Sequence, residues 1–179
     1  AATSNAAKGS GDQKIGDFWT TAMDSTKIEA DGLKPIQPLI DKVNAINDVK
    51  SLISVVSEFK KIGSYTLFSD YVSQDAKKSD VMAFHLYQGG LGLPEREYYF
   101  KTDSTTVNIR NQYLKYISKI LTMAGEDTAL ASASAKNILK LETYLAKSSR
   151  KIEDLRDPYK NYNKMAITDL GKMSSKIEW

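Results

Sequence analysis

The amino-acid sequence predicts a mainly α-helical protein with one β-hairpin. Apolar residues recur at three- and four-residue steps over most of the 179 residues, which is the pattern of helices that bury one face. One region alternates instead, and it is rich in Leu, Phe, Tyr, Val and Met on both sides of a polar stretch. Three glycines and a proline follow within residues 89–94, and they mark a change from one kind of structure to another.

The length and composition are those of an ordinary globular domain. Hydrophobic residues make up 41% of the chain and charged residues 26%, so a core can be buried without a disulfide or a metal. No cysteine is present, which excludes disulfides, a thiolate nucleophile and cysteine zinc sites. The net charge of +3 arises within residues 147–164, where acidic residues separate the basic ones. This pattern predicts a solvated face and no nucleic-acid partner. No uncharged run reaches the ~20 apolar residues of a membrane-spanning segment.

The first half of the chain begins with a polar segment and continues with helices. Residues 1–13 are small and polar and predict a flexible segment, and the domain is expected over residues 14–179. A helix is predicted over residues 36–46, with Pro35 in its first turn. Its apolar face consists of Leu39, Ile40, Val43 and Ile46.

The next helix is delimited by a cap and a stop. Its apolar residues recur over residues 49–59, Asp48 is a suitable N-cap, and Gly63 is a suitable stop. After it, residues 66–72 and 81–88 predict the two strands of the hairpin, and the polar stretch 73–80 predicts the turn between them.

The glycine-rich stretch 87–100 is predicted to be structural. A dinucleotide-binding fingerprint would need a third glycine where Glu95 stands, and no Gly-Lys-Ser/Thr of a phosphate-binding loop occurs. We therefore expect a backbone turn in which at least one of Gly89, Gly90 and Gly92 has positive φ. A short helix is predicted to start at Pro94, with an acidic first turn. Its buried face is expected to consist of Tyr98, Tyr99 and Phe100.

The second half predicts two longer helices. Apolar residues make a wide stripe over residues 109–124, and Gly125 ends it. The following helix opens near Asp127 and is predicted to run through Leu155, because residue 157 precedes a proline and is disfavoured in a helix. A last helix is predicted to begin near Thr168.

Few residues suggest chemistry. His85 is the only histidine, so neither a two-histidine metal site nor a second histidine for a catalytic relay is available, and a structural role is predicted for it. Glu153 and Asp157 form an E-x-x-x-D, but no H-E-x-x-H accompanies them, and charged helix ends supply such pairs by chance. The residues alone indicate a helical domain without a visible active site.

Three blocks of sequence resemble the neprilysin family of zinc metallopeptidases. These are GDFWTTAMDSTKIEADGLKPIQPLIDKVNAI (16–46), YQGGLGLPEREYYF (87–100) and RDPYKNYNKMAITDL (156–170), in the family's order. Departures are small: Trp19 stands where a tyrosine is commoner, and Glu97 where an aspartate is usual. The resemblance gives a structural role to the motif residues Gly89, Gly90, Gly92, Pro94, Arg96, Tyr98 and Tyr99.

The resemblance implies a segment of the family's helical N-terminal domain. The family's H-E-x-x-H, its glutamate ligand and its substrate-binding Asn-Ala-aromatic motif are missing from this sequence, so no catalytic or metal-binding residue is nominated. Zinc would belong to the C-terminal thermolysin-like catalytic domain of the same protein, with peptides as substrates and an extracytoplasmic setting. The helical part would wall the chamber in which those peptides are cut. The alternative is a stand-alone helical module that binds a protein or peptide without protease activity.

The end of the chain is expected to meet the rest of such a protein. Its apolar residues are Tyr159, Tyr162, Met165, Ile167, Leu170, Ile177 and Trp179. They are too apolar for a free tail. The alternative, that they fold back to finish the local core, is equally open at this point.

Overall fold

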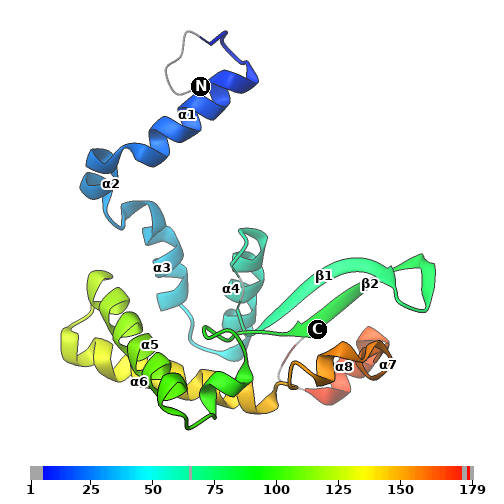
Figure 1. Ribbon diagram of the computed structural model, residues 1–179. Helices are drawn as coiled ribbons and strands as arrows, with labels where there is room; N and C mark the ends of the chain where they lie inside the picture. The colour runs from blue at the N-terminus through cyan, green and yellow to red at the C-terminus, as the bar shows by residue number, and fades with distance from the viewer. Residues whose placement is uncertain (1–5, 65, 175–176, 178–179) are drawn as a thin grey trace. The chain divides into compact units, whose positions relative to one another are not determined.

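The computed structural model describes residues 6–64, 66–174 and 177. They divide into two compact units, residues 1–45 and 46–179. The first unit contains α1 (Gly11–Met23), α2 (Ser25–Asp31), the 3-10 turn η1 (Lys34–Ile36) and α3 (Gln37–Asn44), as Figure 1 shows. The predicted class, mainly α with one β-hairpin, is confirmed. Trp179 of the expected interface lies outside the described residues.

Local capping defines the helices of the first unit. The Ser10 side chain accepts a hydrogen bond from the Gln13 N–H at 3.2 Å, so α1 begins within the segment predicted to be flexible. The Asp24 carboxylate caps α2 in the same way, accepting from the Lys27 N–H at 2.9 Å. Pro35 lies in η1, directly before α3.

The second unit opens with α4 (Val49–Lys61), whose predicted cap and stop are confirmed. The Asp48 carboxylate accepts from the Ser51 N–H at 2.6 Å, and the Ser51 hydroxyl accepts from the Asp48 N–H at 3.1 Å. This reciprocal pair is a capping box, with serine in the place usually taken by glutamate. Gly63 follows the helix with φ +82°, the conformation that ends helices most easily at glycine.

The hairpin consists of β1 (Phe68–Asp75) and β2 (Lys78–Gln88) in antiparallel register. The predicted turn over residues 73–80 is too long, because Ser73 and Gln74 continue the ladder opposite Ala83 and Met82. The reversal takes only residues 76–77, where the Asp75 carboxylate accepts from the Lys77 N–H at 2.8 Å. Polar residues are typical of turns, but backbone pairing does not require apolar side chains on an exposed strand.

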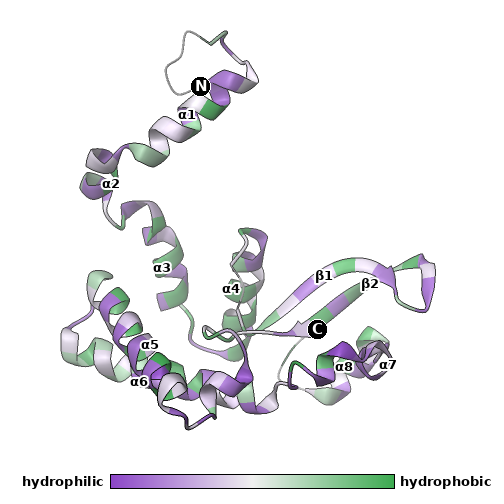
Figure 2. Cartoon of the chain, in the orientation of Figure 1, coloured by the Kyte–Doolittle hydropathy of each residue, from purple (hydrophilic) through white to green (hydrophobic). Residues whose placement is uncertain are grey.

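The longest helices are α5 (Ser104–Met123) and α6 (Thr128–Ser148), which pack side by side (Figure 1). Asp127 caps α6 as predicted, and Gly125 between the two helices has φ +99°. Both helices carry apolar residues interspersed with polar ones (Figure 2), as expected for helices that bury one face. The core beside them contains Leu93, Tyr99 and Ala146, with Leu91, Tyr98, Ile109, Tyr113 and Leu139 packed against it.

The prediction that α6 runs through Leu155 is wrong. The helix ends at Ser148, and the backbone of Arg150 pairs instead with a side chain of β2. The Arg150 N–H donates to Gln88 Oε1 at 2.9 Å, and Gln88 Nε2 donates to the Arg150 carbonyl at 3.1 Å. At Arg150 these two hydrogen bonds take the place of the backbone hydrogen bonds that a longer α6 would form. The remaining elements are η3 (Asp154–Arg156), α7 (Pro158–Asn161) and α8 (Ile167–Met173).

Candidate functional site

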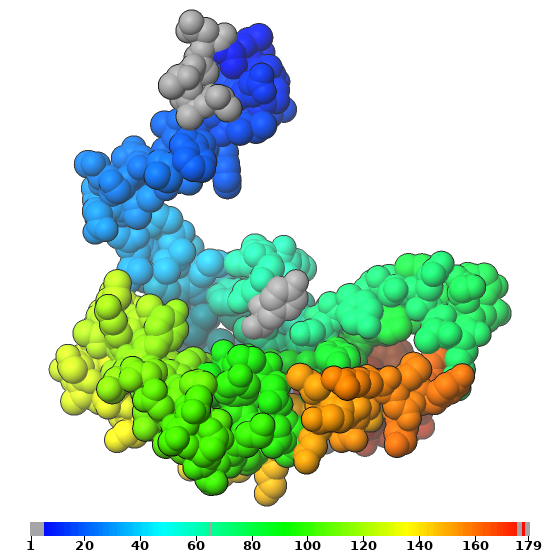
Figure 3. All heavy atoms as spheres, in the orientation of Figure 1, coloured from blue at the N-terminus to red at the C-terminus, as the bar shows by residue number. Residues whose placement is uncertain are grey.

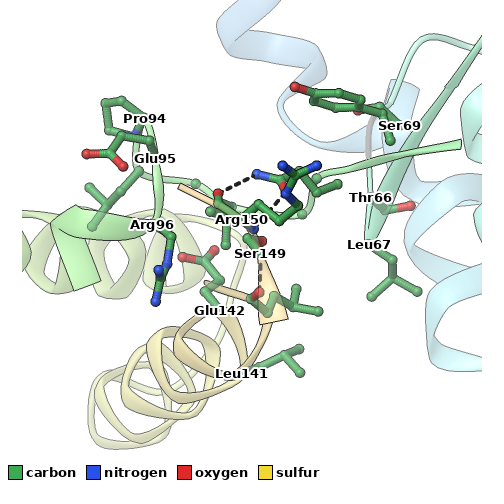
Figure 4. Close-up of a pocket in the computed structure, with 18 of the residues that line it drawn as sticks. Thr66, Leu67, Ser69, Pro94, Glu95, Arg96, Leu141, Glu142, Ser149 and Arg150 are labelled. Carbon is green, nitrogen blue, oxygen red and sulfur yellow. Dashed lines mark hydrogen bonds between the residues drawn. The ribbon is translucent and has the colours of Figure 1, made fainter. Parts of the chain in front are cut away.

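An open cavity of about 670 Å³ lies in the second unit between the glycine segment and α6 (Figure 4). Its walls come from the start of β1, the end of β2, residues 89–96 and the last turns of α6. The predicted structural motif therefore forms one side of this cavity. The contacts of the motif residues show whether any of them is available for binding or catalysis, or whether all of them support the fold.

Gly90 confirms the predicted positive φ. Its φ is +77°, and a Cβ placed on it would lie 2.9 Å from both the Cα and the carbonyl oxygen of Leu67. Leu67 itself has φ +53°, an uncommon value for a residue with a side chain. The backbone at Gly90 therefore passes close to the backbone at Leu67. Position 90 requires glycine both because its φ is positive and because a Cβ has no room.

Positions 89 and 92 require glycine only because a Cβ would have no room there. A Cβ on Gly89 would lie 3.0 Å from the Ser69 backbone nitrogen, and a Cβ on Gly92 only 1.8 Å from Tyr113 Oη. Neither has a φ in the left-handed region. The glycine segment thus packs closely against β1 at Gly89 and against Tyr113 of α5 at Gly92.

The short helix after Pro94 is the 3-10 turn η2 (Arg96–Tyr99), which begins two residues later than predicted. The Glu95 carboxylate caps it by accepting from the Glu97 N–H at 3.0 Å. Arg96 Nε donates to the Ala146 carbonyl in the last turn of α6 at 3.2 Å, so this cation binds the helix end that favours positive charge. The Arg96 side chain therefore has a structural contact within the fold.

Of the three aromatic residues expected to be buried, Tyr99 is buried and Tyr98 is half-buried. Phe100 does not belong to the buried face, because 37% of it is exposed. The expectation failed there because a 3-10 turn of four residues cannot present three consecutive side chains to one side.

A cluster of two tyrosines and one glutamate lies beside the cavity, whose lining includes Glu142. Tyr99 Oη donates to Glu142 Oε2 at 2.7 Å, and Tyr113 Oη donates to Glu142 Oε1 at 2.8 Å. The Leu93 N–H donates in turn to Tyr99 Oη at 3.0 Å. Burial, and then the neighbouring carboxylate, raises the pKa of both tyrosines, so their hydroxyls stay protonated as donors.

This cluster is suited to holding elements together. Each oxygen of the Glu142 carboxylate accepts one hydrogen bond from a hydroxyl, which is the condition under which a buried carboxylate is tolerated. The three side chains come from η2, α5 and α6 and join these elements at one point. Sequence reasoning did not single out Glu142. The available signal was its position between Ile138 and Ala146, four residues from each along the helix.

A second cluster ties the hairpin tip to the segment after α7. Asp75 is 4% exposed, and its carboxylate accepts from Lys164 Nζ at 2.6 Å and from Tyr162 Oη at 3.1 Å. The hydrogen bond from Lys164 is the first cause that lowers the Asp75 pKa to about 2. Lys77 Nζ lies 4.3 Å from the centre of the Tyr162 ring. Tyr162 and Lys164 belong to the third sequence block, and Asp75 was not anticipated as their partner.

The remaining candidates have structural contacts. His85 stacks on Tyr71 across the hairpin, with 4.8 Å between ring centres and 3° between planes. Asp157 caps α7 by accepting from the Tyr159 N–H at 3.0 Å, so E-x-x-x-D marks a helix start. Within residues 6–64, 66–174 and 177, no three histidine or acidic side chains gather as a metal site would require. No helix in these ranges has the length and apolar character needed to cross a bilayer.

Comparison with known proteins gives this architecture a context. A sequence model of the N-terminal part of peptidase family M13 matches residues 1–179. Endothelin-converting enzyme 1 of Cavia porcellus is 31% identical over 186 residues, which cover 98% of this chain and 24% of that protein. Neprilysin-3 of Drosophila melanogaster is 24% identical over 182 residues, which cover 96% of this chain and 23% of that protein.

Solved structures agree with these matches. A zinc metalloprotease of Mycobacterium tuberculosis, in complex with an inhibitor, matches with a TM-score of 0.86 and 25% identity over 96% of this chain and 26% of that one. The same metalloprotease in an open state matches with a TM-score of 0.84. The chain spans about a quarter of the length of these proteins.

Proposed function

The chain belongs to peptidase family M13, the neprilysin family, and from this premise we propose that it walls the substrate chamber of a larger zinc metalloendopeptidase. The resemblance drawn from residues 16–46, 87–100 and 156–170 is confirmed by a family match over the whole chain. In this proposal residues 14–179 are a non-catalytic segment of the helical N-terminal domain. This segment limits access to the chamber to peptides.

One observation carries the proposal. The chain matches the N-terminal part of the family from its first residue to its last, yet it spans only about a quarter of relatives that are named as enzymes. The clusters at Glu142 and Asp75 support a structural role, because each of their carboxylate oxygens accepts a hydrogen bond within the fold. Hydrogen-bonded clusters that join separate elements suit a domain whose role in the larger protein is structural.

The residues of this chain do not fit a catalytic zinc. Zinc in proteins is held mainly by histidine, cysteine and carboxylates, and a catalytic site uses three of them. This chain has no cysteine and one histidine, His85, which is stacked on Tyr71. We therefore assign zinc and peptide hydrolysis to the C-terminal catalytic domain of the same protein, in an extracytoplasmic setting.

The isolated chain is expected to bind no stoichiometric zinc and to cleave no peptide. Metal analysis of purified residues 1–179 and hydrolysis of an unstructured fluorogenic peptide test this, with the full-length protein as the positive control. One tightly bound zinc per chain, together with turnover that EDTA abolishes, would assign catalysis to this segment and overturn the proposal.

The role as a chamber wall is tested in the full-length protein with substrates of graded size. One cleavable sequence is presented as a short peptide, as a longer peptide and as an exposed loop of a small stable domain. We expect kcat/KM to fall with size and the folded substrate to resist cleavage until it is unfolded. Cleavage of the folded substrate at the rate of the short peptide would show that access is not limited.

The alternative, a stand-alone binding module, is separated from this proposal by the sequence that follows residue 179 in the full-length protein. A peptidase of this family requires H-E-x-x-H on a helix there, with the two histidines on one face to bind zinc. If the full-length protein lacks that motif, the module is the better description.

A further inference from the structure

A second open cavity, of about 440 Å³, lies between α5 and α6 and is called here the α5–α6 groove. Figure 3 shows the side chains of these helices, in yellow-green and yellow, lying against each other. Three exposed lysines line the groove, and we refer to Lys115, Lys119 and Lys136 as the groove lysines. Serine and threonine hydroxyls line it as well, whereas no acidic residue does among those that the structure describes. The groove therefore presents positive charge together with hydroxyl groups.

The groove is hollow because the side chains that α6 contributes to it include small ones. Ser132 and Ala135 line it, and Ala135 is 1% exposed, so this residue lies at the bottom. Leu114 of α5 is half-buried and adds to the apolar floor. Long lysine side chains can place their stems on such a floor while their ammonium groups stay in water at the rim. A compact group that enters the groove is thus within reach of ammonium groups from both helices.

The groove lysines have no counter-charge in this chain. The sequence of α5 contains no acidic residue, and that of α6 contains only Glu142, whose two oxygens accept hydrogen bonds from tyrosines. Within residues 6–64, 66–174 and 177, none of the groove lysines forms an ion pair. Exposed lysines elsewhere pair with an aspartate three or four residues away, as do Lys27, Lys160 and Lys172.

This arrangement is unfavourable unless an anion is present. Lys115 and Lys119 are four residues apart on one helix, where side chains are neighbours and like charges destabilise the helix. The facing helix adds Lys136 to the same groove. The hydroxyls of Ser118 and Ser132 also line the groove and have no hydrogen-bond partner in the described part of the chain, so they are free to donate to an oxyanion.

We propose that the α5–α6 groove binds a small divalent oxyanion, phosphate or sulfate, as the free ion or as a monoester. Such a group carries about two negative charges at neutral pH and several strong acceptor oxygens, which match the ammonium and hydroxyl donors of the groove. A nucleic-acid backbone requires cations spread along its length, whereas these three lysines line one hollow. The inference goes beyond the proposed function, because every residue it uses lies in this chain.

The test measures how fast each lysine of the full-length protein is acetylated at pH 8 by an amine-reactive ester, with mass spectrometry as the readout. Buffers of equal ionic strength contain chloride, inorganic sulfate, inorganic phosphate or glucose 6-phosphate, so general screening is the same in all four. We expect sulfate and phosphate to slow acetylation of the groove lysines several-fold relative to chloride. Lys147, exposed on α6 but outside the groove, is the internal control and should react equally in all buffers. Stronger protection by glucose 6-phosphate than by inorganic phosphate would identify a monoester, and the reverse would identify the free ion.

Matched variants separate binding from a structural role. Lys119→Gln and Lys136→Gln should each remove most of the protection at the two remaining groove lysines, whereas Lys147→Gln should keep it. In chloride, the Tm of Lys119→Gln should be no lower than that of the wild type, because the change removes a like-charge neighbour of Lys115.

Three outcomes would overturn the inference. Equal acetylation of the groove lysines in all four buffers would show that the groove does not bind the oxyanion. Equal protection of Lys147, or full protection retained in Lys119→Gln and Lys136→Gln, would show that the effect does not come from the groove. Groove lysines that already resist acetylation in chloride would show that the rest of the full-length protein covers them.

Discussion

Gly90 and Gly92 stand two residues apart and are required for different reasons. Gly90 has φ +77°, a conformation in which any Cβ is strained. Gly92 has an ordinary backbone, but a Cβ there would overlap the Tyr113 hydroxyl that donates to Glu142. At the scale of single residues, a motif that reads as one turn therefore combines a conformational requirement with a packing requirement.

Gly90→Ala and Gly92→Ala are each expected to destabilise the fold by about 1–3 kcal/mol, the range for a strained backbone residue or a buried polar group that loses its partner. Gly92→Ala acts by displacing Tyr113, which leaves a Glu142 oxygen without its donor. Urea unfolding measures the effect. The control is Gly171→Ala, where a Cβ meets nothing within 4 Å and φ is not positive. Midpoints equal to that of the control would refute the packing account.

At the scale of elements, the hairpin is joined to distant segments by side chains at its two ends. Gln88 at the end of β2 binds the Arg150 backbone where α6 stops. Asp75 at the end of β1 binds Lys164 after α7. Because Asp75 is buried and its carboxylate is charged, its contribution to stability depends on pH.

Asp75 is expected to stabilise the fold near neutral pH and to lose this effect in acid. Its folded pKa of about 2 lies below the ordinary value of 3.8, so the folded state favours the charged form. The stabilisation is complete above the ordinary pKa and disappears as the pH falls toward 2. Thermal unfolding of the wild type and of Asp75→Asn measures it. The difference in Tm should shrink between pH 5 and pH 2, and a difference that stays constant would contradict the assignment.

At the scale of the whole molecule, many large apolar side chains of the second unit remain exposed. The segment after Pro158 includes Tyr159, 81% exposed, and Ile167, 66% exposed, so these two side chains do not complete the local core. Tyr162 is an exception because its hydroxyl binds Asp75 within the unit. The segment thus contains both a local contact and uncovered apolar residues.

Limited trypsin digestion is expected to cleave after Lys160 or Lys172 quickly in the isolated chain and slowly in the full-length protein. Both lysines are exposed and lie in or beside short helices, where local opening is easy. Lys140, within the long helix α6, is the internal control and should resist in both. Equally slow cleavage after Lys160 and Lys172 in both proteins would mean that the segment belongs to the local core.

The sequence alone determined the features that depend on neighbours along the chain. The caps at Asp48 and Asp127 and the stops at Gly63 and Gly125 could be predicted, because each acts within one turn of its helix. The family could also be recognised, because its blocks are contiguous stretches whose order survives in the sequence.

Only the tertiary structure decided where α6 ends and what the candidate site contains. The partner of Arg150 is Gln88, 62 residues earlier, and the partner of Lys164 is Asp75, 89 residues earlier. Glu142 meets Tyr99 across 43 residues. No local pattern encodes such pairs, because a side chain's hydrogen-bond partner depends on which elements pack together. Periodicity favoured a longer α6, but α6 ends at Ser148 and the Arg150 backbone forms two hydrogen bonds with the Gln88 side chain instead.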